Sequence, residues 1–522
     1  MNKIHVLDCT LRDGGYCNNW EFGFENIQRI TAALVSAGID VVECGFLSNK
    51  SVFDKNVSKF NTLEEIKEVI PSDKNGKLFV AMVNAGEYDA DELPENDGKS
   101  VDGIRVAFHK KDMASALELC KKISAKGYLV FIQAMVSLAY TDEEFLELIK
   151  SVNQLNPYAF YIVDSFGMMK GKDLTRLFYM VEHNLDEKIW IGFHSHNNMQ
   201  LAYSNAQTLC GVTTSRNLII DSSVYGMGRG AGNLNTELFV SFLNENYDKE
   251  YHIKPLLTII DEILNDFYQR NYWGYSLPNY LSASHNAHPN YAGYLDDKKT
   301  LTVEDMNEIF SMMDEDKKVV FDKAYMEDLY LRYMEKGRDN DEHIAELKSA
   351  IRDKKLLLIA PGKSSADEKE KINSFLNDQE VISASVNFDF DGSEYIFLSN
   401  LRRFKELKES HKKCIVTSNI PTGKVYLSIP YKKLLNDEEA VKDNAGLMAI
   451  RFFIDLGVKE IYLAGFDGYT HDVKQNYSDS KLEIISKNAV LDAMNEGMNK
   501  IISRYSKEID IHFLTTPKNI QI

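Results

Sequence analysis

The chain has 522 residues, and its 60 Lys and Arg against 78 Asp and Glu give a formal net charge of −18 at pH 7. This acidic balance argues against a broad surface that binds the phosphates of nucleic acid or of anionic membranes. The hydrophobic fraction of 44% and the charged fraction of 26% exclude wholesale disorder, while 10 Pro and 29 Gly exclude a fibrous class.

The cysteines indicate a reducing compartment. None forms a C-x-x-C pair, so we expect free thiols, most of them small buried hydrophobic side chains, at Cys9, Cys17, Cys44, Cys120, Cys210 and Cys414. The opening residues MNKIHVLDCTLRD contain no apolar segment of signal-peptide length, and nowhere do about 18 apolar residues follow one another. A cytoplasmic protein is therefore expected.

The first half of the chain repeats a short apolar run followed by an amphipathic segment with helical spacing. The runs are rich in β-branched and aromatic residues and cover 3–9, 39–46, 77–83, 101–107, 128–135, 159–164, 189–194 and 217–223. Eight such units in about 240 residues predict a (β/α)8 TIM barrel. An open doubly wound sheet is the alternative, but polar residues gather at the carboxyl ends of the runs and favour the closed form.

The remaining chain changes character twice, so the whole is an α/β protein of three parts. We predict a catalytic barrel over 1–248, a helical extension and linker over 249–352, and a Rossmann-like α/β domain over 353–522. The strand candidates of the last part are 355–365, 395–400, 413–419, 424–430 and 459–469.

Two segments of the predicted barrel carry chemistry. Arg12 and Asp13 follow the first run, and Gly14 and Gly15 are expected to let the backbone turn tightly over the barrel mouth. His194 and His196 end the seventh run two residues apart, so on a strand both project to the same side. Two imidazoles and one carboxylate hold a divalent metal with positions open for a substrate, and barrel active sites lie at this rim.

A third segment, SSVYGMGRGAGNLNTE at 222–237, resembles a dinucleotide-binding fingerprint because it follows a strand and precedes a helix. We reject that interpretation, since the unit is the last of the barrel and no acidic residue ends a strand about 20 residues later. We interpret it as a glycine-rich loop whose backbone amides approach a carboxylate or phosphate.

The motifs LRDGGY, YIVDSFGMM, HSHNN and GMGRGAGNLNTE follow one another in an order that resembles a known family. They are similar to the pyruvate-carboxyltransferase/HMG-CoA-lyase-like metal-dependent barrels, and within these to 4-hydroxy-2-oxovalerate aldolase-type proteins, over about residues 1–300. The resemblance implies that Asp13, His194 and His196 hold Mn²⁺ or Mg²⁺ and that Arg12 is the catalytic arginine. Asn233 matches an asparagine that is a further metal ligand in the lyase members.

The sequence departs from these aldolases at one catalytic position. They carry a histidine acid/base three residues after the metal-binding Asp, where this chain has Tyr16. A tyrosine with an ordinary pKa of about 10 is a poor base at neutral pH. We therefore expect Tyr16 to donate a proton or a hydrogen bond, while a metal-bound water or another side chain acts as the base.

The reaction implied by the resemblance makes or breaks a carbon–carbon bond next to a 2-oxo acid such as pyruvate, with an aldehyde as partner and a role in sugar or surface-polysaccharide precursor metabolism. One alternative is a Claisen-type acyltransferase that condenses acetyl-CoA with a 2-oxo acid, and another is a non-catalytic barrel scaffold. A Schiff-base aldolase needs a lysine near a strand's carboxyl end. The predicted strands offer only Lys3 and Lys77, at their starts.

Further polar residues occupy the predicted strands. Glu43, Arg105, Gln133 and Ser165 are candidate substrate contacts, with ion pairing inside the barrel as the alternative. Asp221 closes the eighth run, and His285 and His288 follow the barrel, where helix packing or a lid is expected for them.

The last part of the chain offers weaker signals. The segment IAPGKSS lacks the full P-loop spacing, so its turn either binds a phosphate or is a plain βα turn. AIRFFIDLGVKEIYLAGFDGY loosely resembles sialyltransferase-like and pterin-pyrophosphokinase-like domains. That resemblance implies a nucleotide or nucleotide-sugar near Gly362, Ser364, Ser399 and Asp467. A homo-oligomer is also expected.

Overall fold

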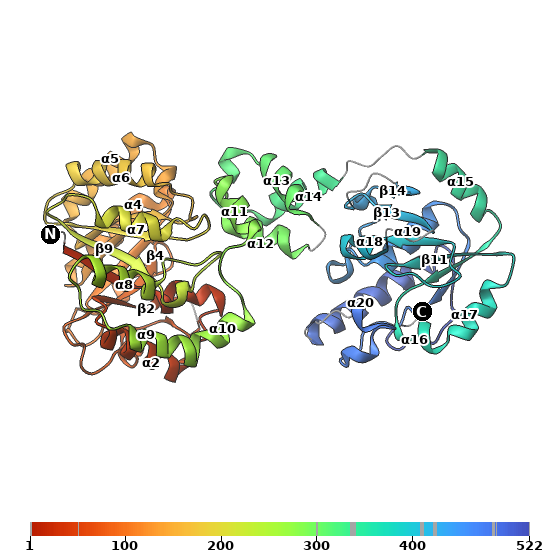
Figure 1. The fold of residues 1–522 in the computed structure, drawn as a ribbon, viewed down its shortest axis with the longest axis horizontal. Coiled ribbons are helices and arrows are strands. Elements are labelled where there is room, and N and C mark those ends of the chain that lie inside the picture. Colours follow the sequence, from red (N-terminus) through yellow and green to blue (C-terminus); the bar gives the residue numbers. More distant parts are fainter. Residues whose placement is uncertain are drawn as a thin grey trace. The chain divides into compact units, whose positions relative to one another are not determined.

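The computed structural model describes residues 3–50, 52–298, 301–334, 341–407, 412–420, 425–482, 486 and 488–520 (Figure 1). The chain divides into two compact units. The first comprises Met1–Tyr294 and Met313–Asp322, and the second comprises Leu295–Met312 and Lys323–Ile522. Each unit has a parallel sheet of its own.

The sheet of the first unit closes into a barrel. Its strands follow the order β1-β9-β8-β7-β6-β5-β4-β2, and β1 also pairs with β2. These strands are β1 (Lys3–Asp8), β2 (Val41–Leu47), β4 (Leu78–Asn84), β5 (Gly103–Phe108), β6 (Leu129–Ala134), β7 (Ala159–Asp164), β8 (Trp190–Ser195) and β9 (Asn217–Ser222), with the short β3 (Lys59–Phe60) beside β2. All eight predicted runs are confirmed to within two residues, and the open-sheet alternative is wrong.

Helices surround these strands in Figure 1. They are α1 (Thr10–Asp13), α2 (Phe24–Ala37), α3 (Leu63–Lys67), α4 (Met113–Ala125), α5 (Asp142–Leu155), α6 (Gly171–Asn184), α7 (Ala202–Cys210), α8 (Thr236–Asn246), α9 (Ile253–Ile259) and α10 (Asn265–Arg270). A π-helical turn covers Ile260–Leu264, and short 3-10 turns cover Gly14–Cys17, Ala90–Glu92, Lys110–Asp112, Ser137–Ala139 and Val224–Gly226. The main hydrophobic core fills the layer between helices and strands.

The barrel interior is built from alternate residues of the strands, because successive side chains of a strand point to opposite faces. A separate apolar cluster inside it includes Leu7, Val41, Val80, Phe131, Tyr161 and Ile219. Moving two residues along the same faces toward the carboxyl ends leads to Glu43, Gln133 and Asp221. The strand period therefore delivers polar side chains to one end of the barrel, above an apolar floor.

A glycine makes room in this floor. A Cβ at Gly192 in β8 would lie 2.4 Å from ring atoms of Tyr161. We expect Gly192→Ala to lower the free energy of unfolding by about 1–3 kcal/mol, because the ring or the strand must shift. Gly293→Ala is the matched control, since a Cβ there meets nothing within 4 Å. Urea unfolding measures both variants, and equal midpoints for the two would contradict this account.

Helices continue after the barrel, as predicted from the sequence. They are α11 (Leu277–Ser284), α12 (Pro289–Asp297), α13 (Val303–Ser311), α14 (Lys323–Met334) and α15 (Asp341–Ile351), with a 3-10 turn at Glu315–Lys317. The boundary between the two compact units falls within this stretch.

The second unit contains an open, all-parallel sheet in the order β14-β13-β12-β11-β10-β15-β16. Its strands are β10 (Lys355–Ile359), β11 (Val381–Val386), β12 (Tyr395–Leu398), β13 (Lys413–Thr417), β14 (Leu427–Ile429), β15 (Glu460–Ala464) and β16 (Asp510–Phe513). Five of them lie within predicted runs, although Lys424, the first residue of the run 424–430, lies outside the described residues. The sequence analysis missed β11 and β16.

After α15, the helices of this unit are α16 (Lys363–Asp367), α17 (Lys369–Leu376), α18 (Leu401–Leu407), α19 (Ala445–Asp455) and α20 (Asn488–Tyr505), with 3-10 turns at Tyr431–Leu434, Glu439–Val441, Val473–Gln475 and Ser480–Leu482. Helix α19 packs against β10, β11 and β12, and α17 packs against β11.

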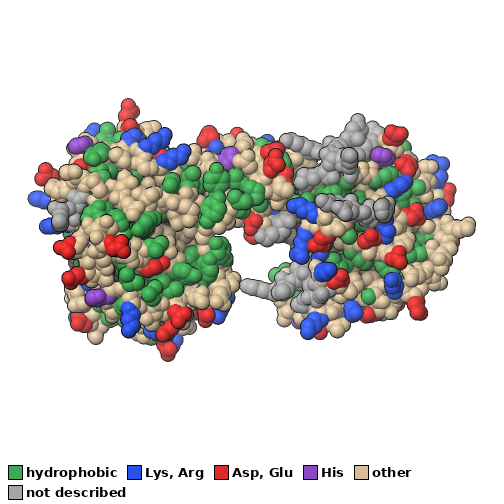
Figure 2. All heavy atoms as spheres, viewed as in Figure 1, with side chains coloured by type: hydrophobic (Ala, Val, Ile, Leu, Met, Phe, Trp, Pro, Cys, Tyr) green, Lys and Arg blue, Asp and Glu red, His purple; other side chains and the backbone are tan. Residues whose placement is uncertain are grey.

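Surface and thiols agree with the composition. Figure 2 shows acidic and basic side chains interspersed on the face that it draws. All six cysteines are unpaired and five of them are buried, which confirms the expected thiols. Within the described ranges, no helix combines the length and the apolar character needed to span a lipid bilayer.

Candidate metal centre and active site

Three side chains converge at the barrel rim. Asp13 from α1, His194 from the end of β8 and His196 just after it are all buried, and each offers a ligand atom within 4.8 Å of the others. The two imidazole rings stand 5.2 Å apart at 90°. In the closed sheet order only β9 separates β8 from β1, so segments far apart in sequence meet here.

Two buried polar atoms at this cluster have no hydrogen-bond partner. One is His196 Nδ1, which lies 3.7 Å from Asp13 Oδ2, and the other is Asn233 Oδ1. The amide nitrogen of Asn233 donates to Asp13 Oδ2 at 2.6 Å and to the Met227 carbonyl at 3.1 Å. Unpartnered buried acceptors are costly, and a cation would satisfy both. The residues present therefore fit a divalent metal.

The protonation of the cluster suits ligation. Burial lowers the pKa of His196 to about 3, so the imidazole is neutral and its lone pair is available. Burial alone would raise the pKa of Asp13, but His196 and Arg12 outweigh it and hold that pKa below its ordinary value. The site thus presents an anionic carboxylate and neutral imidazole, the forms that metals bind.

A chain of ion pairs surrounds the cluster. His194 Nδ1 lies 3.0 Å from Asp221 Oδ2, which leaves Nε2 as its ligand atom. Asp221 also accepts from Arg105, and Arg105 Nη1 lies 2.9 Å from Glu43. The chain returns to the metal cluster through Arg12, whose Nε donates to Glu43 at 2.9 Å and whose Nη1 donates to Asp13 at 2.5 Å.

This chain shows where the candidate substrate contacts lie. Glu43 and Arg105 are fully buried and pair with each other inside the barrel. Gln133 Nε2 is buried with no partner, and Ser165 Oγ accepts a hydrogen bond from the Val136 amide. Arg12 Nη2 donates to none of the described residues, so this guanidinium keeps one edge for a ligand.

At the mouth of the barrel, Trp20 and Arg229, which the sequence analysis did not single out, lie against Tyr16. Tyr16 packs edge-on against Trp20 at 4.7 Å, and the Arg229 guanidinium lies 5.3 Å from the Tyr16 ring. Arg229 donates to the Ser165 carbonyl at 3.3 Å, its Nε is buried without a partner, and no described carboxylate pairs with it. The sequence signal that could have identified Arg229 is its position between two glycines.

The role expected of Gly14 and Gly15 was wrong. Gly14 has φ −60° and ψ −27°, ordinary helical values that any residue adopts. The missing side chains matter instead, since a Cβ at Gly15 would lie 2.0 Å from the Trp20 indole. The indole in turn donates to the Arg12 carbonyl at 2.7 Å, which fixes the segment that carries Arg12 and Asp13. In the glycine loop, a Cβ at Gly228 would lie 2.2 Å from Asn233 Nδ2.

Two other sequence expectations concern His288 and the lysines of the barrel. His288 packs edge-on against Phe166, which follows β7, with ring centroids 5.4 Å apart. Among the described residues, the one buried lysine is Lys318, which lies after the barrel strands and pairs with Glu315. Lys77 donates to the Gly38 carbonyl at the opposite end of the barrel, so it is not placed for a Schiff base.

The HMGL-like family model matches residues 3–261. The 4-hydroxy-2-oxovalerate aldolase of Pelotomaculum thermopropionicum is 30% identical over 250 residues, which cover 47% of this chain and 70% of that protein. The chain belongs to the HMGL-like family. This confirms the resemblance inferred from the four motifs.

Two further proteins are similar to this HMGL-like chain over about half of its length. The 4-hydroxy-2-oxovalerate aldolase of Carboxydothermus hydrogenoformans is 28% identical over 266 residues, 50% of this chain and 77% of that protein. The solved N-terminal domain of a Bacteroides vulgatus protein described as an aldolase is 28% identical, with a TM-score of 0.49, over 57% of this chain and 98% of that one. The family and its aldolase-named members support the expected class of enzyme, a carbon–carbon lyase.

Proposed function

We propose that the barrel is a divalent-metal-dependent aldolase that breaks or makes a carbon–carbon bond next to a 2-oxo acid of the pyruvate type. The observation that carries this proposal is the buried cluster of Asp13, His194 and His196, with the unpartnered acceptor of Asn233 beside it. These residues would hold Mn²⁺ or Mg²⁺. Such a metal, when bound, polarises a substrate carbonyl as a Lewis acid.

Arg12 stabilises the negative charge that grows on the 2-oxo oxygen as the bond breaks. Asp13 and Glu43 fix its guanidinium from two sides and leave Nη2 without a partner among the described residues. The same carboxylates raise the pKa of Arg12 against the opposing effect of burial, so it stays cationic. A fixed cation of this kind needs no reorganisation during the reaction, which is why it is effective.

Tyr16 and Arg229 bind the other half of the substrate at the barrel mouth. Partial burial raises the pKa of the Tyr16 hydroxyl, so it is protonated at neutral pH and acts as a hydrogen-bond donor rather than a base. In the cleavage direction, the 4-hydroxyl gives its proton to water as the C3–C4 bond breaks, and water later returns a proton to C3. The Tyr16 hydroxyl orients the 4-oxygen, and Arg229 offers its unpartnered Nε to acceptor atoms further out.

The test is release of pyruvate from 4-hydroxy-2-oxo acids, followed by coupled reduction of the pyruvate. We expect turnover that EDTA abolishes and that Mn²⁺ or Mg²⁺ restores. Turnover that resists EDTA would refute the metal-dependent mechanism. Thiol release from acetyl-CoA with a 2-oxo acid would favour the acyltransferase instead, and inactivity in both assays would favour the scaffold.

We expect Tyr16→Phe to lower kcat about 10–100-fold while leaving metal content unchanged, because it removes one donor and no ligand. Tyr179→Phe is the matched control, since Tyr179 is 40% exposed on α6, away from the strand ends. A Tyr16→Phe enzyme with the wild-type kcat would remove the hydroxyl from the mechanism.

A further inference from the structure

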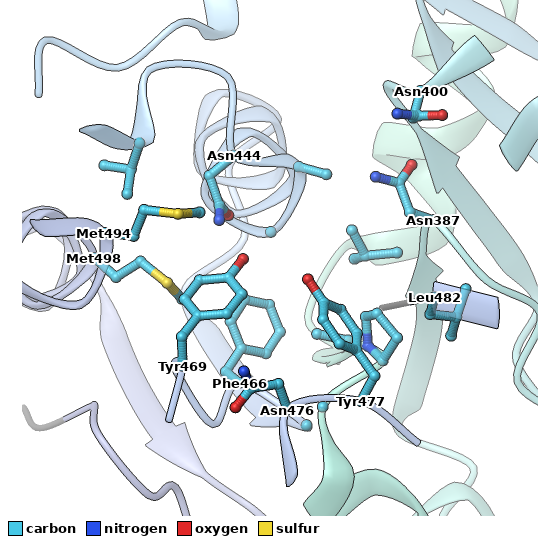
Figure 3. A pocket seen from close by; sticks show the side chains of 18 of the residues that line it. Asn387, Asn400, Asn444, Phe466, Tyr469, Asn476, Tyr477, Leu482, Met494 and Met498 are labelled. Atoms are coloured by element: carbon cyan, nitrogen blue, oxygen red, sulfur yellow. The ribbon is translucent and has the colours of Figure 1, made fainter. Parts of the chain in front are cut away.

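The second unit has a cavity of about 710 Å³ at the carboxyl edge of its sheet (Figure 3). The segments after β10, β11, β12 and β15 contribute to its wall, together with the start of α19 and one face of α20. The HMGL-like match ends at residue 261, so nothing in the family likeness assigns this cavity a role.

The strand order places the cavity where an open sheet offers a crevice. From β10 the chain adds β11, β12, β13 and β14 in one direction, and then returns to place β15 on the other side of β10. The connections that leave β10 and β15 therefore run in opposite directions and part at the carboxyl edge. Open α/β sheets bind ligands at such switch points.

Three asparagine side chains are held so that they donate into the cavity. The Oδ1 atom of each accepts a backbone N–H: Asn387 from Ser399 at 3.1 Å, Asn400 from Arg403 at 3.2 Å, and Asn444 from Leu447 at 3.1 Å. This fixes the orientation of each carboxamide, and none of the three amide nitrogens has a partner among the described residues. Figure 3 shows the side chains of Asn387 and Asn444 directed toward the cavity.

The charged side chains at the wall and the start of α19 also favour an anionic ligand. Lys298, Arg402 and Arg403 outnumber the two acidic residues of the lining, and Arg402 and Arg403 share one carboxylate, that of Glu406. The first turn of α19 begins at Ala445 and Gly446, whose backbone N–H groups have no intrahelical partner. Donor groups thus outnumber acceptors, and a ligand rich in oxygen acceptors and negative charge fits them.

The two acidic residues of the wall are turned to other partners. Both carboxylate oxygens of Asp467 bind Ser364, and Asp443 Oδ2 accepts from Tyr431 at 3.5 Å. The turn with Ser364 is therefore tied to the sheet, and Lys363 pairs with Asp367. Asn444 and the start of α19 therefore offer a phosphate hydrogen-bond donors, whereas the side-chain donors of the Gly-Lys-Ser-Ser turn considered from the sequence already have protein partners.

Aromatic and thioether side chains line another part of the cavity. Tyr469 and Tyr477 stand beside each other with ring centroids 6.4 Å apart, and Figure 3 shows Met494 and Met498 approaching Tyr469 from α20. Tyrosine rings and thioethers together accept a planar aromatic group. The cavity therefore pairs an anion-binding wall with a surface for a ring.

We infer that this cavity binds a nucleotide. Its phosphate oxygens accept hydrogen bonds from the Asn444 amide and the start of α19, and its base packs against Tyr469 and the methionines. The inference is independent of the chemistry proposed for the barrel.

Calorimetric titration of the full chain with nucleoside monophosphates and diphosphates tests this inference, with inorganic phosphate and the unphosphorylated nucleosides as further probes. We expect at least one nucleotide to bind, and its nucleoside and inorganic phosphate to bind at least about 10-fold more weakly. Binding of no nucleotide, or equal affinity for phosphate or nucleoside alone, would overturn the inference.

Asn444→Asp separates ligand binding from folding. Asp is as good an N-cap as Asn and keeps the acceptor for Leu447, but it replaces the amide donor with a negative charge. We expect it to weaken nucleotide binding at least about 10-fold, while the control Asn373→Asp on α17 leaves binding unchanged. Equal weakening by both variants would refute the assigned contact. Binding that survives His196→Ala and EDTA would keep this result separate from the barrel's function.

Discussion

His196→Ala is expected to lose more than about 100-fold in affinity for Mn²⁺ and to lose pyruvate-forming activity in the same measure. Mutating a partner of a metal ligand costs about 10–100-fold, and His196 is itself a proposed ligand. The fold should persist, because the substitution removes a buried nitrogen that has no hydrogen-bond partner. Metal content after dialysis, together with circular dichroism, measures the two effects separately.

The matched control for this variant is His183→Ala. His183 lies on α6 and stacks on Tyr179 outside the barrel interior, with ring centroids 5.9 Å apart. It should keep both metal and activity. A His196→Ala protein that retains wild-type metal content would show that the cluster is not the metal centre.

Arg105→Ala is expected to lower the free energy of unfolding by about 3–5 kcal/mol, because it leaves the buried Glu43 and Asp221 carboxylates uncompensated. Arg105 has no exposed surface and is paired with both. Lys121→Ala is the control, since the pair of Lys121 with Glu118 is exposed and such a pair contributes about 1 kcal/mol or less. Guanidinium unfolding compares them, and a similar loss in the two variants would contradict the assigned importance of the buried chain.

The positions of the barrel strands could be predicted because each strand is a buried run bounded by polar residues. The same period placed Glu43, Arg105 and Asp221 inside the barrel. Their pairing depends on neighbours that are up to 116 residues apart along the chain, and the sequence alone left substrate contact and ion pairing equally open. The distances in the structure show that these three side chains form ion pairs with one another.

Two strands of the second unit could not be predicted, for reasons visible in their residues. In β11, the small polar Ser383 and Ser385 alternate with apolar residues, so the run looks half exposed although every residue is buried. Strand β16 has four residues, lies at the edge of the sheet and begins with the exposed Asp510. A short edge strand gives little apolar signal.

The candidate metal ligands could be predicted from the sequence more readily than the residues that hold them in place. His194 and His196 carry a spacing that the sequence displays. Arg229, Trp20 and the clash that keeps Gly15 free of a side chain depend on loop conformation, which no period records. The same holds for Asn444, whose role as a donor follows from which of its atoms the backbone already occupies.

The chain of ion pairs has a consequence for the order in which ligands arrive. Asp13, Glu43 and Asp221 carry one more negative charge than Arg12 and Arg105 can neutralise. A 2-oxo acid entering first would add a second unbalanced anion to a dry interior, whereas a dication entering first reverses the sign. The monoanionic acid then brings the whole assembly to neutrality, so loading is expected to be sequential, with the cation ahead of the acid.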